Sequence, residues 1–490
     1  MSKEALISIS IIAVYMISVN LYVRHRSKLE SAGDVDGFAV GGRSFPWYMV
    51  MFTILATWYT GSCFTGGFGY AVSFGVVALY DTTQVVIGLV FLYVFGPKIW
   101  KWGKIYNLYN LPDFIRLRYN DKKLAIVVTV FTIAIGFPWN MMAFKTFGIL
   151  IHSLTYNAIP VNVGIVLSVV FILSYSLRGG QKSVVTSDFI QGLVMIFGSL
   201  GVIFFLANKL FGGFGPMFQQ VAAKTPELLT VPDASYWSSI ILAGIFGSFC
   251  WMEIFNRMFV ARSPRELKIS TAGAPILGSS MYIALLLLGV GCSLIPAVAA
   301  DPESGFLTVS AMTGGPVLLG FVGIIVLAAE VSSADSGLVT GGFVIADALI
   351  KPFNPKLTDE QLIKYSRIIV ICIASLSGFL AMFEIPMLQK IAIFTFEYIV
   401  NVFPIDIIGL LWKRGNSKAA WSGLTVGVIV TTLLKLFPAF AAAHFGSWAP
   451  GILGLFCNII VYVVVSLLSK PDPRVNELFD SVKNASFETA

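Results

Sequence analysis

Long apolar runs follow one another along almost the whole chain and are separated by short polar loops. Each run is close to the ~20 residues that a helix needs to cross a bilayer. The runs occupy thirteen stretches: 4–23, 46–70, 76–97, 124–153, 159–177, 187–207, 237–256, 270–298, 315–350, 364–383, 387–411, 419–440 and 449–469. A helix satisfies its own backbone hydrogen bonds in lipid, so the pattern predicts an all-α polytopic membrane protein with about 13 transmembrane helices.

Composition narrows the class of protein further. Of the 490 residues, 57% are apolar and only 12% are charged, whereas soluble domains carry about 25% charged residues. Because the apolar runs are joined by short loops, we expect one integral membrane transporter domain over residues 1–490, with the lipid bilayer as its surroundings.

The distribution of basic residues predicts the orientation of the chain. Most of the 33 Lys and Arg residues, Arg118 and Arg257 among them, fall in alternate loops, and the other loops carry only Lys3, Lys209 and Lys224. Basic residues gather on the cytoplasmic side of membrane proteins. We therefore expect the N-terminus outside and the C-terminus in the cytoplasm, in a plasma (inner) membrane. The net charge of +7 follows from this bias and requires no nucleic-acid partner.

Residues typical of enzymes and metal centres form no pattern. The three histidines are scattered, and the five cysteines lie within apolar runs without CxxC spacing. Such cysteines behave as small apolar side chains. The sequence also contains no phosphate-binding loop and no nucleophile motif. We expect no enzyme activity and no cofactor.

Ionisable side chains inside the apolar runs are costly, so each is a candidate functional residue. They are Asp81, Lys145, Asp188, Glu253, Glu330, Asp335, Lys390, Glu397 and Asp406. The alternative is a structural ion pair or, for Lys390 and Asp406, a position at the membrane interface. The roles of Glu253, Glu330, Glu397 and Asp406 are left open by the sequence.

The stretch EVSSADSG at 330–337 places several oxygen-bearing side chains within one run. On a helix, Ser332, Asp335 and Ser336 lie at i, i+3 and i+4 and share one face. Ala329 lies one turn before Ser332 and offers a carbonyl if the facing helix is broken. Carboxylate, hydroxyl and carbonyl oxygens suit hard cations, although a serine-rich face also permits close helix packing.

Two runs are predicted to be broken helices. ATWYTGSCFTGGFG at 56–69 is rich in Gly, Thr and Ser, and FGSFCWME at 246–253 lies five runs later. Broken helices whose freed carbonyls bind the coupling ion are typical of transporters with inverted repeats. The resulting organisation is an extra N-terminal helix at 4–23, a first repeat at 46–207, a second repeat at 237–411, two C-terminal helices at 419–469 and a cytoplasmic tail at 470–490.

Three longer motifs resemble signatures of the sodium:solute symporter family, over a similarity that extends from the first run to about residue 430. They are YSLRGGQKSVVTSDFIQG at 175–192, LLWKRGNSKAAWSGLTVG at 410–427 and NLPDFIRLRYN at 110–120. The resemblance implies a LeuT-like core of five-plus-five helices. It also implies that sodium is the coupling ion for import of a small organic solute by alternating access.

The resemblance also implies two ion sites. The main sodium site would use the carbonyls of Ala56, Tyr59 and Ala329 and the hydroxyls of Ser332 and Ser333. A second sodium, bound by some members, would use Asp188, Ser332, Asp335 and Ser336. Here Asp335 supplies a carboxylate where many members have serine.

Within the family, the nearest branch that the sequence resembles is the high-affinity choline transporter. ATW, VSSADS, the PW of GFPWNMMAF and CWMEIFNR match its segments and place Trp58, Trp139 and Trp251 at aromatic cage positions. Tryptophan faces stabilise quaternary ammonium groups; packing or an interface belt is the alternative role. Ile391 replaces a fourth cage aromatic, with Phe394 and Phe396 nearby.

Two charged residues extend this hypothesis. Asp81 follows Tyr80, where sugar-carrying members place an acid that contacts the substrate, and Lys145 follows Trp139 by six residues. Lys145 would repel a bare cation but could meet a carboxylate. The favoured solute is therefore an amine or zwitterion such as a quaternary ammonium compound, a betaine or an amino acid.

Alternative functions share the same scaffold. Proton coupling through Glu330 or Glu397 is the main rival to sodium, and a monocarboxylate, a pantothenate-like acid or a sugar is the rival substrate. A transporter-like sensor is disfavoured by the short tail, and a channel by acids that form discrete clusters rather than pore rings. A monomer suffices for the predicted transport.

Overall fold

A computed structural model describes residues 2–29, 35–177, 180–354 and 356–485 of the chain. In these residues the fold is entirely helical, with a single isolated bridge between Phe45 and Ala261 in place of any strand. Of the predicted tail, 486–490 lie outside the described residues, and so does Arg178 in the motif at 175–192.

Each of the thirteen predicted runs contains helix. The main helices are α1 (Lys3–Leu29), α3 (Trp47–Trp58), α5 (Leu79–Tyr106), α7 (Lys122–Leu154), α8 (Val161–Ser176), α9 (Gln181–Leu193) continuing into α10 (Ser199–Phe211), α12 (Ala234–Ser248), α13 (Met252–Val260), α14 (Pro264–Cys292), α16 (Gly305–Ile345), α17 (Asp359–Ala381), α18 (Leu388–Ile399), α20 (Ser417–Leu436) and α22 (Pro450–Leu468). Within the described residues, nine helical stretches are long and apolar enough to cross a membrane, or ten if the bent pair α12–α13 counts as one span. The shorter α3 and α8 are also apolar.

Both predicted helix breaks are confirmed. Helix α3 ends at Trp58, where Tyr59 leaves the helical region with φ −98° and ψ 85°. Helices α12 and α13 are bent by 49°, with Trp251 in an extended conformation between them. Gly61 follows the first break because a Cβ atom there would overlap the Glu330 carboxylate and the Val326 carbonyl of α16. Small residues thus allow α16 to pass directly against the broken segment.

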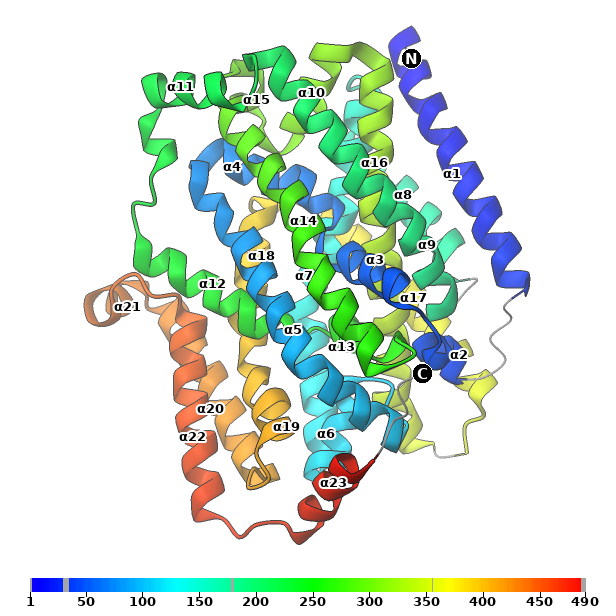
Figure 1. Cartoon of the computed structure of the whole chain (residues 1–490), viewed down its shortest axis with the longest axis vertical. Coiled ribbons are helices and arrows are strands. Elements are labelled where there is room, and N and C mark those ends of the chain that lie inside the picture. Colours follow the sequence, from blue (N-terminus) through cyan, green and yellow to red (C-terminus); the bar gives the residue numbers. More distant parts are fainter. Residues whose placement is uncertain (1, 30–34, 178–179, 355, 486–490) are drawn as a thin grey trace.

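Helix α1 and the pair α20–α22 lie at opposite edges of the bundle (Figure 1). Helix α1 packs on α16, where Ile11 and Ile12 fill the space above Gly320 and Gly323. The division of the core into two repeats stays a prediction.

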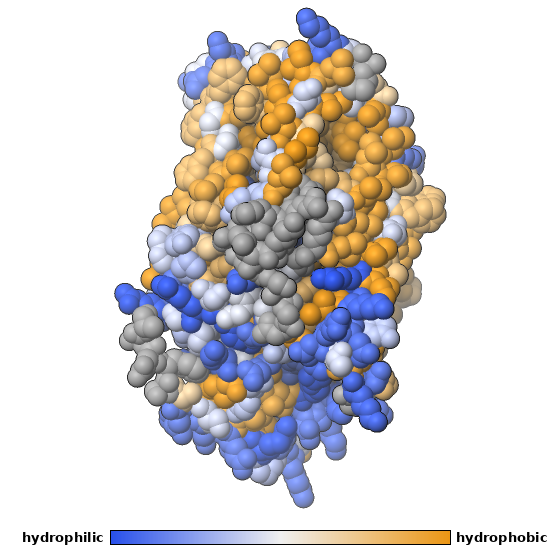
Figure 2. Space-filling model, turned by 90° about the vertical axis from the view of Figure 1, so that its right-hand side faces the viewer, coloured by the Kyte–Doolittle hydropathy of each residue, from blue (hydrophilic) through white to orange (hydrophobic). Residues whose placement is uncertain are grey.

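The surface is suited to lipid over much of its height. Large apolar side chains such as Val14, Ile276 and Ile460 are exposed, which soluble proteins avoid in large patches. Figure 2 shows apolar residues covering the upper part of the face that carries α1, with polar residues gathered at the lower end.

Short helices close the two ends of the bundle (Figure 1). Helix α11 (Phe214–Lys224), from a predicted outer loop, lies at the top, and α6 (Leu111–Tyr119) and α23 (Pro473–Asn484), from predicted inner segments, lie at the bottom. Asn110 caps α6 by accepting a hydrogen bond from the Asp113 amide. Arg118, which we counted among the loop charges, is instead fully buried and donates to the carbonyls of Gly409 and Trp412.

Candidate functional site

The break in α3 faces the serine-rich part of α16, and the two form a compact cluster of oxygen atoms. The Ser333 hydroxyl donates to the Ala56 carbonyl over 2.7 Å and to the Ala329 carbonyl over 2.9 Å. The Ser332 hydroxyl donates to the same two carbonyls over 3.5 and 2.9 Å. Four of the five predicted ligands of the main sodium site therefore lie within hydrogen-bonding distance of one another.

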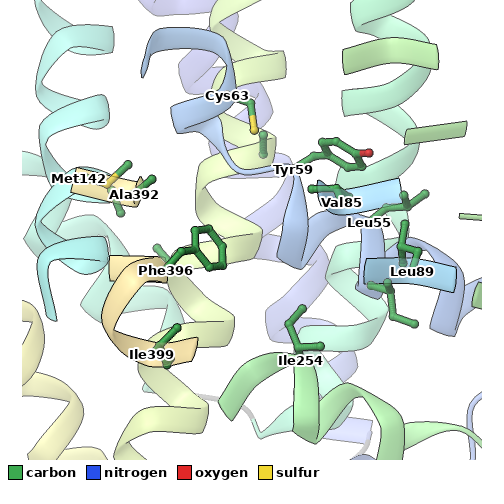
Figure 3. Close-up of a cluster of buried hydrophobic side chains, with 14 of the residues drawn as sticks. Leu55, Tyr59, Cys63, Val85, Leu89, Met142, Ile254, Ala392, Phe396 and Ile399 are labelled. Atoms are coloured by element: carbon green, nitrogen blue, oxygen red, sulfur yellow. The ribbon is translucent and has the colours of Figure 1, made fainter. Parts of the chain in front are cut away.

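The fifth predicted ligand, Tyr59, sits at the break itself. Its amide donates to the Leu55 carbonyl over 2.8 Å. Its ring, labelled in Figure 3, packs against Gly278 of α14 and lies 5.5 Å from the Tyr282 ring. The side chain thus holds the broken segment against α14, and the ligand predicted from Tyr59 is its backbone carbonyl. Sodium binding by these five residues stays a prediction.

A buried arginine lies among the predicted ligands of the second sodium. Arg257 of α13 is fully buried and pairs with Asp188 of α9, with 3.4 Å between Nη2 and Oδ2. It also donates to the hydroxyls of Ser336 and Thr57 and to the Gln181 side chain. The guanidinium therefore supplies positive charge at a place where the sequence predicted a sodium ion.

The remaining atoms of this cluster are tightly held. The Thr53 hydroxyl donates to Asp188 over 2.5 Å, and the Gln181 amide donates to the Thr340 hydroxyl over 2.6 Å. Asp335 is buried nearby and interacts electrostatically with Arg257, but its Oδ1 atom has no hydrogen-bond partner in the described residues. Asp188 thus forms the ion pair with this guanidinium, and Glu253 and Asp335 act on it electrostatically. A second sodium site here remains a prediction.

Next to the serine cluster lies a cavity lined by all three predicted cage tryptophans. The Trp139 and Trp251 rings are 5.2 Å apart, centre to centre. The Phe396 ring completes the group at 6.2 Å from Trp139 and 6.0 Å from Trp251. Phe396 reaches in from α18 (Figure 3), so it provides a fourth aromatic ring close to Ile391.

The two tryptophans outside α7 lie at the helix breaks. Trp58 is the last residue of α3, and Trp251 precedes the first turn of α13. The same cavity is bordered by Ser333 of the predicted sodium site. It extends to Gly341 and Ile345 near the C-terminal end of α16. An ion at the serines and a solute in the cavity would therefore be neighbours.

The charges that line this cavity are all negative. Glu253 and Glu330 contribute carboxylates, and the lining residues in the described part of the chain include no Lys, Arg or His. In a low-dielectric surrounding such a cavity favours a positively charged group.

Tyr80, Asp81 and Lys145 are not among the described residues that line the tryptophan cavity, and a contact of these three with a solute stays a prediction. Asp81 accepts hydrogen bonds from Tyr282 over 2.6 Å, from Gln84 over 2.6 Å and from Gln389 over 2.9 Å. Gln389 also donates to the Tyr80 hydroxyl over 2.6 Å. These partners occupy the polar atoms that a solute would need.

Lys145 has a different neighbour from the one expected. It interacts electrostatically with Glu303, whose carboxylate accepts a hydrogen bond from the Leu388 amide over 2.7 Å. An acid just before α16 is thus close enough to interact with the lysine charge. The carboxylate of a zwitterion bound between the tryptophans would not meet this lysine.

Three other ionisable residues of the predicted spans lie outside the tryptophan cavity. Glu397 pairs with Lys435 at 3.0 Å and accepts from the Gly451 amide over 3.2 Å. Lys390 is exposed and lies over the Phe74 ring at 5.6 Å. Asp406 is fully buried, and neither of its oxygens has a hydrogen-bond partner in the described residues. None of the three lines the tryptophan cavity.

Sequence reasoning missed the role of Arg257. It follows Glu253 by one helical turn in the CWMEIFNR stretch, and we assigned it to an inner loop. The signal available was its position one turn past a predicted break, where the chain is still within the bundle.

Comparison with known proteins gives the same class of protein. The model of the family described as "Sodium:solute symporter family" matches residues 38–427. The symporter YhjB of Bacillus subtilis is 26% identical, covering 94% of this chain and 97% of its own. The osmoregulated proline transporter OpuE of the same organism is 25% identical, with 96% of each chain covered. A sodium/proline symporter of Staphylococcus aureus is also 25% identical, with 96% of this chain and 95% of its own covered.

A solved structure supports the fold. The substrate-bound outward-open state of a Na+-coupled sialic acid symporter superposes with a TM-score of 0.78 at 18% identity, covering 95% of this chain and 98% of its own. At this identity the likeness establishes the LeuT-like fold alone. The family match and the relatives establish a multi-pass membrane transporter, rather than an enzyme, that couples solute import to sodium. With four-fifths of its length matched by the family model, the chain belongs to the sodium:solute symporter family.

Proposed function

We propose that the protein imports a small solute with an amine group, together with sodium bound by Ala56, Tyr59, Ala329, Ser332 and Ser333. The observation that carries the proposal is the cavity in which three tryptophans and Phe396 stand beside Ser333. A cation over a desolvated tryptophan face gains about 2 kcal/mol or more. Several such faces make an ammonium group the best-matched occupant.

Alternating access requires segments that change position, and the helix breaks at the end of α3 and between α12 and α13 would provide them. Sodium would hold the end of α3 against α16, because its ligands come from both. The same break carries Trp58 into the cavity. Ion binding would thus shape the solute site, which is the physical basis for coupling.

Proline is the second candidate solute. Two relatives carry proline in their names, and proline has a secondary amine that is protonated at neutral pH. Its carboxylate, however, would find no cationic side chain among the lining residues. The same absence weighs against a monocarboxylate or a pantothenate-like acid, and the aromatic lining offers few hydrogen-bonding groups for a sugar.

A ligand screen on purified protein tests the proposal. Choline, glycine betaine, proline, a monocarboxylate and a neutral sugar would each be added with sodium or with potassium, and the melting temperature measured. We expect the amines to raise the melting temperature in sodium only, because ligand binding to the folded state stabilises it. Sodium-dependent stabilisation by the sugar or the monocarboxylate alone would contradict an amine substrate.

Coupling to protons is the alternative to coupling to sodium, and measurements of solute uptake distinguish the two. Glu330 lines the cavity, whereas Glu397 is paired with Lys435, so Glu330 is the acid through which protons would act. Uptake that persists in potassium and collapses with a protonophore would favour the rival.

We propose that the N-terminus is outside and the C-terminus is in the cytoplasm. A cysteine at Gly213, between α10 and α11, should react with a membrane-impermeant reagent added to sealed cells, and one at Asn484, at the end of α23, should not. The native cysteines provide the background and are measured in parallel. Equal labelling at both positions would contradict the orientation.

A further inference from the structure

We propose that Glu253 is the residue that selects a solute with a net positive charge. This inference rests on the proposed function and makes it more specific, because it names the chemical class as a quaternary or protonated amine without a carboxylate. Three features of Glu253 carry it: its position in the cavity, the absence of an ion pair or side-chain hydrogen bond to it in the described residues, and its place two residues after a cage tryptophan.

Glu253 lies on the first turn of α13, two residues after Trp251. Both residues line the cavity. The helix break places the Trp251 ring and the Glu253 carboxylate on one short rigid segment, so they would move together. An ammonium group against the ring would therefore find a carboxylate supplied by the same helix.

Within the described residues, Glu253 forms no ion pair and accepts no hydrogen bond from another side chain, although it interacts electrostatically with Arg257 one turn later. Across the cavity it faces α16 and α7: a Cβ atom on Gly337 would be 3.3 Å from Glu253 Oε1 and 3.8 Å from Asn140 Oδ1. The absence of a side chain at Gly337 keeps this carboxylate accessible from the cavity. Glu253 is half-buried, and a carboxylate without an ion pair in such a place is costly, so a cationic solute would offset that cost.

Two other charged residues near this part of the cavity, Arg257 and Glu330, are held mainly by other groups. Arg257, one turn later on α13, directs its guanidinium at Asp188, Gln181 and Ser336. Glu330 is almost wholly covered, packed against Gly61 and Ser62. Its backbone neighbour Ala329 belongs to the predicted sodium site. Glu330 is thus almost wholly covered by the broken end of α3, whereas Glu253 is partly exposed.

This arrangement separates three kinds of solute by charge. The binding of a cation is favoured both by the tryptophan rings and by the Glu253 carboxylate. A zwitterion gains at its ammonium group but brings a carboxylate into a cavity whose charged lining residues are both acidic. The binding of a neutral molecule of the same shape is favoured by packing contacts alone.

The test compares choline with its uncharged carbon isostere, in which a carbon atom replaces the nitrogen. Binding of both to purified full-length protein in sodium is measured by calorimetry for the wild type, Glu253→Gln, Glu253→Asp and Trp251→Ala. Glu227→Gln removes an exposed acid outside the cavity and serves as the matched control. Asp81→Asn removes the acid that the family resemblance favoured.

We expect Glu253→Gln to weaken choline binding at least tenfold and to leave the isostere unchanged, with Glu253→Asp between the wild type and Gln. Trp251→Ala should weaken both compounds, and Glu227→Gln neither. Unchanged choline affinity in Glu253→Gln, equal loss for both compounds, or a loss confined to Asp81→Asn would each overturn the assignment to Glu253. If the wild type bound no amine in sodium, the proposed function would fail and this inference with it.

Discussion

Replacing Arg257 with alanine is expected to lower the free energy of unfolding by about 3–5 kcal/mol and to abolish uptake. The side chain is fully buried and compensates Asp188, with Asp335 close by. Removing the guanidinium leaves these carboxylates without a counter-charge and breaks the bonds to Gln181 and Ser336. Unfolding of the purified variant in detergent, followed by intrinsic fluorescence, measures the loss.

Two further variants serve as controls for the Arg257→Ala measurement. Arg257→Lys keeps the charge but cannot make the same fork of hydrogen bonds, so it should recover part of the stability. Lys413→Ala breaks an exposed pair with Asp480 and should change stability by less than ~1 kcal/mol. Wild-type stability and uptake in Arg257→Ala would show that the buried pair has no such role.

Removing either serine hydroxyl of the predicted sodium site is the second large change. Ser332→Ala and Ser333→Ala should each weaken sodium binding by about 1–3 kcal/mol, because each removes one ligand oxygen. The sodium concentration for half-maximal uptake should rise by roughly fivefold to more than a hundredfold, while uptake at saturating sodium is largely retained. Asp335→Asn should change it in the same direction, since it removes a nearby negative charge.

Ser310→Ala provides the control for this series. Ser310 lies on the same helix α16, far along it from Ala329, and among the described residues it donates to the Phe306 carbonyl alone. Its removal should leave the sodium dependence unchanged. Sodium dependence identical in all four variants and the wild type would show that the ion binds elsewhere.

Much of the fold follows from local sequence signals. Runs of apolar residues locate the helices, because lipid and the packed interior both exclude charge. The breaks near Tyr59 and Trp251 follow from local composition, since residues such as Gly61 allow close approach at the cost of a regular helix. The serines of 330–337 share a face because the helical period requires it, and their partner carbonyl at Ala56 was inferred from the resemblance and found close by.

The partners of the buried charges were not predictable in the same way. Asp81 and Lys145 look alike in sequence, as single charges in apolar runs, yet each meets a neighbour from a distant helix. Loop charges were misjudged for the same reason: Arg118 and Arg257 lie next to polar stretches but point inward. The sequence pattern shows that a charge within a span is energetically costly. It does not show which residue compensates that charge.

The sequence by itself determined the class of protein, the helix positions and the two breaks, because these depend on hydrophobicity and on residues close together in the chain. The choice of Trp58, Trp139 and Trp251 came from the resemblance to a family branch. Only the tertiary structure decided which of those residues share a space. It brought Trp58, Trp139 and Trp251 to one cavity and placed Glu253 there, whereas Asp81 is not among the described residues that line it. The physical reason is that charge compensation acts over a few ångströms in space, whereas the groups that provide it, such as Asp188 and Arg257, are far apart along the chain.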